Sequence, residues 1–399
     1  MTDLQASSPR LDNLRVLALF GGTRLFGQER GNIEALRNLA ALGAKVRVIT
    51  TSRGNASEVQ KELDRQGLEW ITAPFGYSWH NYLFGRHFYY LFLNLYSIFA
   101  VSWRVWNQAR KWKPTHLYTM NWQYFVYAYP ALFLLNLPLV WRAGDMPPSH
   151  SRVHKWVGRR ICRRVTQMAC ISRFIMAQWE GVGMSPNKMR VIHNYPPRRV
   201  RVASVTKPVD ETFKSIVYLG QVSAEKGVFV LVEAVQKLFE KRADLELVVA
   251  GEPSWGKVES ERLMRIISDQ GLANRIRLLG FVEDVGALLG KAYVHVCPSM
   301  CNEALGNVVL EAKQMGIPSV VFPDGGLPEM IEHKVDGYIC RESSVSALVE
   351  GLEYFLDNPD DRRRAGVAAQ RSLDNRFGLR RFQKQWAEMF CPAMANRRM

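Results

Sequence analysis

The 399-residue sequence lacks any uninterrupted apolar stretch long enough to cross a bilayer, so we expect no membrane-spanning helix. Its first residues, Met1 to Asn13, are polar and have no apolar core behind a basic stretch, which argues against a signal peptide. The six cysteines are scattered, and Cys297 and Cys301 lack the second pair that would complete a zinc site. Low-complexity tracts and short repeats are also missing. We therefore expect a globular cytosolic protein with reduced thiols.

Length and charge divide the chain into two parts. A chain of this length exceeds one ordinary core and suits two domains of about 200 residues each. Residues 1–215 carry 30 Lys and Arg against 12 Asp and Glu, whereas residues 216–399 carry 23 against 25. A basic domain beside a nearly neutral one indicates a one-sided contact with an anionic partner. Nucleic acid, an anionic membrane surface and a phosphorylated lipid all fit this description.

The order of predicted elements indicates an α/β fold. An apolar strand at Leu14–Phe20, the turn Gly21–Gly22, a helix ending near Gly43 and a strand at Lys45–Thr50 form a βαβ unit. The pattern restarts at Lys214–Leu219, after a basic, proline-containing linker between residues 196 and 207. The further strands predicted are His116–Met120, Leu137–Trp141, Thr166–Ile171, Leu245–Ala250, Arg275–Leu279, Tyr293–Cys297 and Pro318–Phe322. We predict two Rossmann-like domains facing a central cleft, with ligands at the carboxyl ends of the strands.

The segment after the strand at Tyr293–Cys297 combines two acidic residues with a helix N-terminus. Glu303 lies in the loop, Gly306 opens the helix, and Glu311 lies about one turn into it. Amides at such an N-terminus suit a diphosphate, and a carboxylate one turn further can accept hydrogen bonds from a sugar diol. The alternative is a structural one, with Glu303 at a helix entry and Glu311 on a solvated face. The spacing alone leaves both interpretations open.

Several motifs in the second half resemble those of one enzyme family. The run from Cys297 to Ala312, CPSMCNEALGNVVLEA, resembles the PS…EGFGxxxxEA signature of retaining GT-B glycosyltransferases of family 4. The run from Tyr218 to Gly227, YLGQVSAEKG, resembles the family's VGR…EKG loop, and the glycine-rich stretch from Gly316 to Glu329 continues the match. The resemblance covers the whole second domain, and the first more loosely. It implies the GT-B fold and a hexosyltransferase activity.

The resemblance also implies roles for individual residues. Glu311 would bind the ribose hydroxyls of the nucleotide, and Glu303 would contact the donor sugar near the reacting carbon. Lys226 would neutralise charge on the departing diphosphate. The remaining expected contacts to the donor come from Gly220, Gln221, Leu305, Gly306 and Asn307. The resemblance implies that no metal or other cofactor is needed.

Two departures from the family pattern concern this donor site. Gln221 stands where the family usually has arginine, so one of two cations expected on the diphosphate is missing, and turnover is slower unless another arginine substitutes. Leu305 stands where phenylalanine is common, a conservative change that keeps the loop packed.

The first domain departs further from the family. The segment from His116 to Trp122 does not reproduce the family's histidine–aspartate pattern, so His116 is expected to be structural, and Asn121 could instead contact the sugar. The loop after Arg142 resembles the family's YRxxDxP segment and makes Asp145 the candidate acidic residue, with loop capping as the alternative. Gly21 and Gly22 would let the acceptor or phosphates approach the backbone closely.

The first domain also carries a segment rich in aromatic residues. Between residues 79 and 112 the sequence has twelve Trp, Tyr and Phe side chains and a basic end, which fits an interfacial segment or a buried core helix. Six cations follow at helical spacing: Arg152, Lys155, Arg159, Arg160, Arg163 and Arg164. Together they favour a peripheral protein on the inner face of the cell membrane that acts on a lipid-linked acceptor.

These observations lead to one assignment and its rivals. We expect an acceptor- and membrane-facing domain at 1–205, a nucleotide-sugar-binding domain at 206–378, and a C-terminal helix at 379–399 packing back on the first domain. The protein would move a sugar to a lipid-linked or glycan acceptor in cell-envelope polysaccharide or glycolipid synthesis, with no nucleic-acid partner. The alternatives are a nucleic-acid-binding protein, which lacks a recognised binding module here, and an epimerase-like or non-catalytic GT-B protein.

Overall fold

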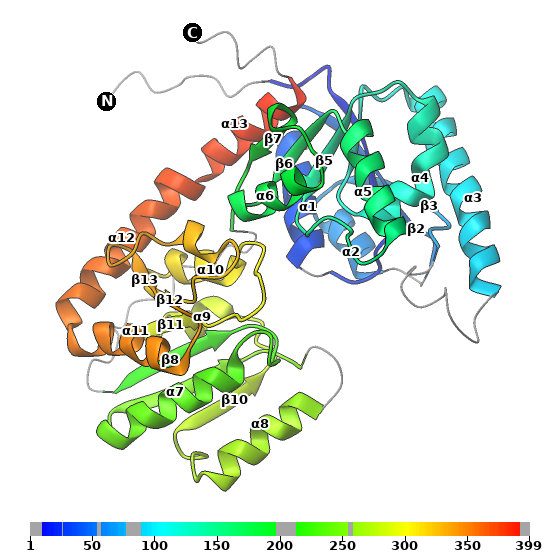
Figure 1. Ribbon diagram of the computed structural model, residues 1–399. Coiled ribbons are helices and arrows are strands. Elements are labelled where there is room, and N and C mark those ends of the chain that lie inside the picture. Colours follow the sequence, from blue (N-terminus) through cyan, green and yellow to red (C-terminus); the bar gives the residue numbers. More distant parts are fainter. Residues whose placement is uncertain are drawn as a thin grey trace, which may run out of the picture. The chain divides into compact units, whose positions relative to one another are not determined.

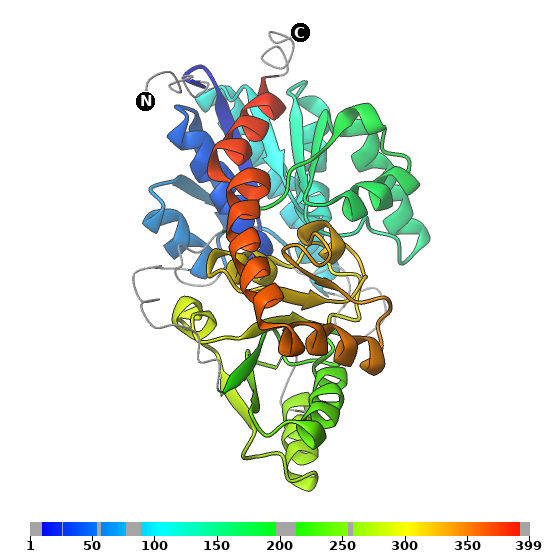
Figure 2. The same ribbon diagram turned by 90° about the vertical axis from the view of Figure 1, so that its left-hand side faces the viewer.

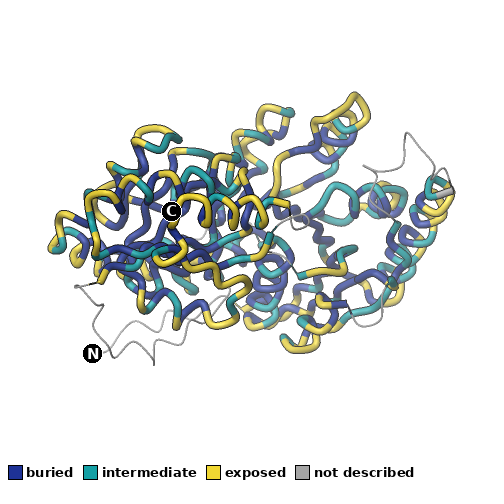
Figure 3. Tube along the Cα trace, turned by 90° about the horizontal axis from the view of Figure 1, so that it is seen from below, coloured by how far each residue is buried: buried dark blue, intermediate teal, exposed yellow. Residues whose placement is uncertain are grey.

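We describe a computed structural model covering residues 10–25, 27–53, 57–76, 89–196, 213–253 and 258–391. The chain forms two compact units, one of residues 1–197 with 379–399 and one of residues 198–378 (Figure 1). The linker predicted between residues 196 and 207 lies outside the described residues, apart from Pro196. Buried residues gather in the interior of each unit, with exposed positions on the outer turns (Figure 3).

The first unit is built on a seven-stranded parallel sheet of order β3-β2-β1-β4-β5-β6-β7. Its strands are β1 (Arg15–Phe20), β2 (Lys45–Thr51), β3 (Glu69–Ala73), β4 (His116–Thr119), β5 (Leu139–Ala143), β6 (Gln167–Cys170) and β7 (Met189–Val191). Its helices are α1 (Gly27–Ala41), α2 (Glu58–Arg65), α3 (Tyr89–Trp112), α4 (Trp122–Leu134), α5 (Arg152–Arg164), α6 (Arg173–Gly181) and the C-terminal α13 (Leu379–Phe390). The helix α13 lies beside α1 (Figure 2).

The second unit repeats this architecture around a six-stranded parallel sheet of order β10-β9-β8-β11-β12-β13. Its strands are β8 (Lys214–Leu219), β9 (Leu245–Ala250), β10 (Ile276–Gly280), β11 (Val294–Cys297), β12 (Ser319–Val321) and β13 (Gly337–Ile339). Its helices are α7 (Val228–Lys241), α8 (Val258–Asp269), α9 (Val285–Leu289), α10 (Asn307–Gln314), α11 (Val345–Asp357) and α12 (Pro359–Phe377).

The inner strands of both sheets are buried on their two faces, which explains why they are near-continuous apolar runs, whereas the edge strands β3 and β10 are mostly half-buried or exposed. In β8, Ile216 and Tyr218 face the core formed with α7 and α11, whereas Val217 and Leu219 face the core formed with α9 and α10. The prediction of two Rossmann-like domains is confirmed. The strand order reverses between β1 and β4 in the first unit and between β8 and β11 in the second. Ligands of such sheets bind where the order reverses, outside the carboxyl ends of the strands.

A buried ion pair fixes α10 within the second unit. The Lys313 ammonium lies 2.6 Å from the Asp336 carboxylate, and both side chains are almost completely buried. The ammonium also donates to Ser372 of α12, and Asp336 accepts the backbone N–H of Glu332 at 2.7 Å. Burial lowers the pKa of Lys313, and the attraction of Asp336 opposes that shift. The pair therefore fastens the helix that carries Glu311.

Removing one partner of this pair should destabilise the second unit strongly. We expect Asp336→Ala to lower its free energy of unfolding by about 3–5 kcal/mol, because Lys313 is left buried without a counter-charge. Glu353→Ala breaks the exposed pair with Lys241 and should cost at most about 1 kcal/mol. Hydrogen exchange of the β11 and β12 amides in urea measures both. Equal losses in the two variants would contradict the assignment.

Candidate functional site

The candidate site of the second unit is formed by the loops that follow β8 and β11. These strands are neighbours in the sheet, so their loops leave the same edge side by side. The backbone carbonyl of Glu225 accepts the amides of Met300 and Cys301, at 2.8 and 3.0 Å. These two hydrogen bonds join the loops directly.

Lys226 and Glu303 meet across this junction as an ion pair. The Ser299 hydroxyl donates a second hydrogen bond to the same Glu303 oxygen, at 3.1 Å. The side chains of Lys226 and Glu303 are 28% and 22% exposed. Burial acts to lower the pKa of Lys226, but the charge and hydrogen bond of Glu303 outweigh it and raise the pKa overall. The lysine is therefore cationic throughout the physiological range and reaches solvent.

Glycines allow the close approach of the surrounding backbone. Gly227 has φ +75°, and a Cβ added there would overlap the Pro298 carbonyl oxygen. Gly325 has φ +62°, and a Cβ there would overlap the backbone of Glu303, whose carbonyl accepts the Gly326 amide at 2.7 Å. The two loops bearing Lys226 and Glu303 are thus held by backbone contacts that a side chain would block.

The helix α10 begins directly after this loop. Its N-cap is Gly306, with φ +87°, which has no side chain to accept hydrogen bonds from the first-turn amides. Leu305 is buried, and a Cβ at Gly306 would overlap Leu327. Asn307 is the first residue of the helix, and Glu311 lies one turn on, only 7% exposed. The amides of this N-terminus suit an anion next to the Lys226–Glu303 pair.

The turn after β8 places Gln221 at the surface. Gly220 has φ +152° and its carbonyl lies against Gly251, where an added Cβ would overlap it. The Tyr218 hydroxyl donates to the Gln221 carbonyl at 2.6 Å, so the backbone is held while the Gln221 side chain is exposed. Gln221 can therefore offer a hydrogen bond to a ligand but no charge.

In the first unit the turn after β1 lies under a tyrosine. A Cβ at Gly21 would lie 2.6 Å from the Tyr124 ring, and one at Gly22 would lie 3.0 Å from its hydroxyl and 3.4 Å from the Glu29 carboxylate. Burial raises the pKa of Tyr124, and the charges of Glu29 and Asp145 raise it further. Gly21 and Gly22 thus let Tyr124 cover the carboxyl end of β1.

Asp145 follows β5 at the same edge of the sheet. The Asp145 side chain reaches solvent. Its pKa is nevertheless raised, because the surrounding protein partly buries the carboxylate. A hydrogen bond from Gln28 and the positive charge of Arg142 act to lower that pKa. Arg142 is buried and donates to Asn194 at 2.5 Å. The negative charge of Asp145 contributes to the raised pKa of Tyr124, the residue that covers the Gly21–Gly22 turn.

His116 and Asn121 of the first unit make structural contacts in the fold. His116 packs against Phe390 of α13, with ring centroids 5.3 Å apart, and Asn121 caps α4 by accepting the Gln123 amide at 2.8 Å. The residues not anticipated at the site are Glu29 and Tyr124, whereas Ser299 belongs to the family motif but had no role assigned to it. For Glu29 the available signal was its place in the first helical turn after a glycine pair; nothing comparable marked Tyr124.

Two Rossmann-like units, each with a glycine turn after its first strand, have the architecture of the GT-B glycosyltransferase folds. The family described as Glycosyl transferases group 1 matches residues 203–372, and the one described as Glycosyltransferase Family 4 matches residues 27–195. The chain belongs to the family 4 glycosyltransferases.

Individual relatives are distant. Spore coat protein SA of Bacillus subtilis is 27% identical over 42% of this chain and 46% of its own length, so the alignment spans about half of that relative. Glycogen synthase of Mycobacterium tuberculosis is 26% identical over 72% of this chain and 71% of its own length. The crystal structure of Anabaena HepE in complex with UDP superimposes with a TM-score of 0.79 at 19% identity, covering 95% of this chain and all of that one.

The close approach at Gly227 can be tested by substitution. We expect Gly227→Ala to cost about 1–2 kcal/mol for its positive φ and about 1–3 kcal/mol more for the clash with the Pro298 carbonyl. Gly271→Ala is the matched control, because Gly271 has φ +66° and open space around the Cβ position, so only the first cost applies. Hydrogen exchange of the β8 and β11 amides in urea compares them. A loss for Gly227→Ala no larger than the control's would contradict the packing described.

Proposed function

We propose that the protein is a retaining glycosyltransferase that moves a sugar from a nucleotide-sugar donor to a lipid-linked or glycan acceptor. The observation that carries this proposal is the Lys226–Glu303 pair, placed beside the open N-terminus of α10 at the crossover of the second sheet. Family membership and the UDP bound to HepE support a nucleotide-sugar donor and make UDP-sugars the first to test.

The donor diphosphate would lie on the amides at the N-terminal end of α10, from Leu305 to Asn307, within reach of Lys226. An ammonium whose pKa is raised stays protonated as negative charge develops on the leaving diphosphate, which stabilises the transition state. These groups supply the charge that other enzymes obtain from a metal ion, and we propose that none is required. Glu311 would accept hydrogen bonds from the ribose hydroxyls, and Gln221 would add an uncharged contact.

Retention is proposed to follow a front-face displacement. Lys226 and Ser299 both bind the same oxygen of the Glu303 carboxylate, which withdraws charge from it and makes it a weaker covalent nucleophile. The bond from the anomeric carbon to the phosphate oxygen would break while the acceptor oxygen attacks the same face. The acceptor proton would pass to the leaving phosphate. Asp145 and the Gly21–Gly22 turn are the acceptor-side candidates.

Removing either member of the pair should abolish transfer. We expect Glu303→Ala and Lys226→Ala each to lower turnover at least about 10²-fold, because each removes electrostatic stabilisation of the transition state. Lys237→Ala, an exposed lysine on α7, serves as the control and should leave turnover unchanged. Hydrolysis of a panel of nucleotide sugars measures the effect, with circular dichroism confirming folding. Full activity in both variants would mean that the loop assignment is wrong.

We further propose that the first unit binds a membrane surface, because α3 has its apolar side facing outward. Phe92, Tyr96, Phe99 and Trp103 follow one stripe of the helix and are 62–70% exposed. The polar residues Asn94, Ser97, Ser102 and Gln108 are buried instead. The Asn94 side chain accepts the Tyr127 hydroxyl at 2.9 Å, and Ser102 donates to the Tyr127 carbonyl at 3.1 Å. A helix of this kind suits the interface of a bilayer.

Neighbouring helices extend this surface. The exposed apolar side chains there are Phe133 and Leu134 at the end of α4 and Val153 and Trp156 on α5. On α5 the cations Arg152, Lys155, Arg159 and Arg163 are exposed, whereas Arg164 donates to the carbonyls of Leu132, Leu135 and Leu137 and so belongs to the packing of α4. The aromatic residues Trp79, Tyr82, Phe84 and Phe88 lie outside the described residues.

None of the helices in the described part of the chain is long and apolar enough to span a bilayer. We propose peripheral attachment to the anionic inner face of the cell membrane, where a lipid-linked acceptor for cell-envelope polysaccharide or glycolipid synthesis would be reached. Each exposed cation near such a surface adds about 1 kcal/mol.

Flotation with anionic liposomes tests this attachment. We expect binding at low salt that weakens at high salt, and a loss of at least about tenfold in Phe99→Ser/Trp103→Ser, which removes two large apolar side chains from the interface. Phe281→Ser removes a 64% exposed phenylalanine of the second unit and should bind like the unmodified protein. Absence of binding at low salt, or an equal loss in both variants, would overturn the proposal.

A further inference from the structure

A buried serine holds one oxygen of the Glu303 carboxylate. Ser299 is only 1% exposed, and its hydroxyl donates to Glu303 Oε2 at 3.1 Å. The Lys226 ammonium binds the same oxygen, so both lone pairs of Oε2 have a donor. The other oxygen, Oε1, accepts no hydrogen bond from the part of the chain that the structure describes. Because the Glu303 side chain reaches solvent, Oε1 keeps two lone pairs for the hydroxyl groups of a ligand.

The orientation of the Ser299 hydroxyl is determined by its own surroundings. The next two amides, of Met300 and Cys301, both donate to the Glu225 carbonyl and fix the backbone of the loop. The Cys301 sulfur lies 3.5 Å from the Ser299 oxygen. Since Ser299 gives its one hydroxyl proton to Glu303, the Cys301 thiol is the donor of this second contact. Ser299 therefore faces Glu303 before any ligand is bound.

Glu303 needs this support because its backbone contacts do not fix its side chain. The Glu303 carbonyl accepts the Gly326 amide at 2.7 Å, which leaves the rotatable bonds of the side chain free. In the proposed reaction the Lys226 ammonium also serves the diphosphate, so it cannot be devoted to Glu303 alone. The Ser299 hydroxyl is buried and has no such second task. It can hold Oε2 while the charge of Lys226 is shared with the donor.

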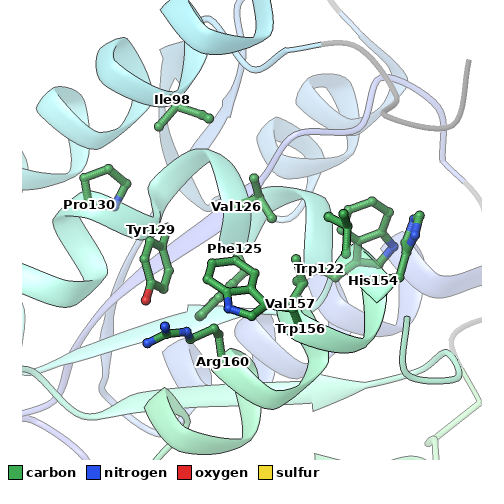
Figure 4. A pocket seen from close by; sticks show the side chains of 11 residues that line it. Ile98, Trp122, Phe125, Val126, Tyr129, Pro130, His154, Trp156, Val157 and Arg160 are labelled. Atoms are coloured by element: carbon green, nitrogen blue, oxygen red, sulfur yellow. The ribbon is translucent and has the colours of Figure 1, made fainter. Parts of the chain in front are cut away.

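The cavity of the first unit offers no comparable acceptor of hydrogen bonds. This cavity of about 320 Å³ lies between α3, α4 and α5, and side chains such as Val126 and Trp156 make its walls aromatic and aliphatic (Figure 4). No Asp or Glu is among the described residues that line it. Sugar hydroxyls are recognised by a few polar groups in fixed positions. The β8–β11 loop junction provides such a group, and this cavity does not.

We propose that Ser299 is a positioning residue of the donor site, which holds Oε2 of Glu303 so that Oε1 accepts hydrogen bonds from the donor sugar. The inference rests on the proposed nucleotide-sugar donor. A carboxylate that is oriented in advance binds the sugar without first losing side-chain freedom, and it keeps the reacting carbon in a productive position. Ser299 acts only through Glu303 and touches neither the sugar nor the diphosphate.

The sugar's share of donor binding tests this role without turnover. Calorimetry without acceptor compares the most active nucleotide sugar of the panel with its own nucleoside diphosphate. Ser299→Ala should weaken the nucleotide sugar about fivefold and leave the diphosphate within twofold, because only the sugar meets Oε1 of Glu303. Ser299→Thr keeps a hydroxyl and should stay within twofold for both. Ser319→Ala removes an equally buried hydroxyl of the same unit, bonded to His295 at 2.9 Å, and should change neither.

A double-mutant cycle separates positioning from a purely structural role. In Glu303→Ala, the further change Ser299→Ala should alter nucleotide-sugar binding less than twofold, since the residue that it positions is gone. Ser299→Ala alone should lower turnover about tenfold, with circular dichroism confirming folding. Equal losses for the nucleotide sugar and the diphosphate, an undiminished effect of Ser299→Ala without Glu303, or unchanged turnover would each overturn the proposal. Inactivity of the unmodified protein toward every nucleotide sugar would instead refute the proposed function, and this inference with it.

Discussion

The junction between the β8 and β11 loops controls the donor-side geometry of the second unit. The Glu225 carbonyl accepts two amides of the opposite loop, and Lys226 then meets Glu303 at the surface of that junction. Because backbone hydrogen bonds set the separation of the loops, neither side chain must find its partner by rotation alone. Such preorganisation is what electrostatic stabilisation of a developing charge requires.

This junction requires backbone contacts closer than side chains allow. Gly227 lies against the Pro298 carbonyl and Gly325 against the backbone of Glu303, both with positive φ. Below them, the buried Lys313–Asp336 pair anchors α10 to the loop before β13 and to α12. Steric fit therefore positions the loop at one end of α10, while a desolvated ion pair holds the remainder of the helix. The pair is costly to break but adds little over an apolar substitute, so its value here is positional.

Much of the fold was predictable from the sequence because buried parallel strands are apolar runs that end in glycine. β8 and β9 have the predicted bounds, and β1, β2, β4 and β11 differ by one residue. β3, β7 and β13 were missed, since Glu69–Ala73 is mixed in character and the other two have only three residues. Glu303 and Lys226 were identified through family motifs, but their pairing across 77 positions had no local signal. The position of Tyr124 over the Gly21–Gly22 turn depends likewise on a tertiary contact that a linear pattern does not contain, whereas Ser299 lies only four positions from Glu303.

The aromatic helix shows why one ambiguity needed a structure. An apolar stripe at helical spacing has the same sequence whether it faces a core or a membrane, so residues 89–112 alone could not decide between them. The orientation follows from the partners of the opposite side. Asn94 and Ser102 both bond to Tyr127 of α4, and Gln108 accepts from Arg47 at 2.8 Å, so the polar side of α3 has its hydrogen bonds inside the unit. Turning the helix over would bury the aromatics but break these bonds, and each unsatisfied buried group would cost about 1–3 kcal/mol. The hydrogen bonds of Asn94, Ser102 and Gln108 inside the unit, more than apolar burial, therefore keep the aromatic stripe of α3 facing outward.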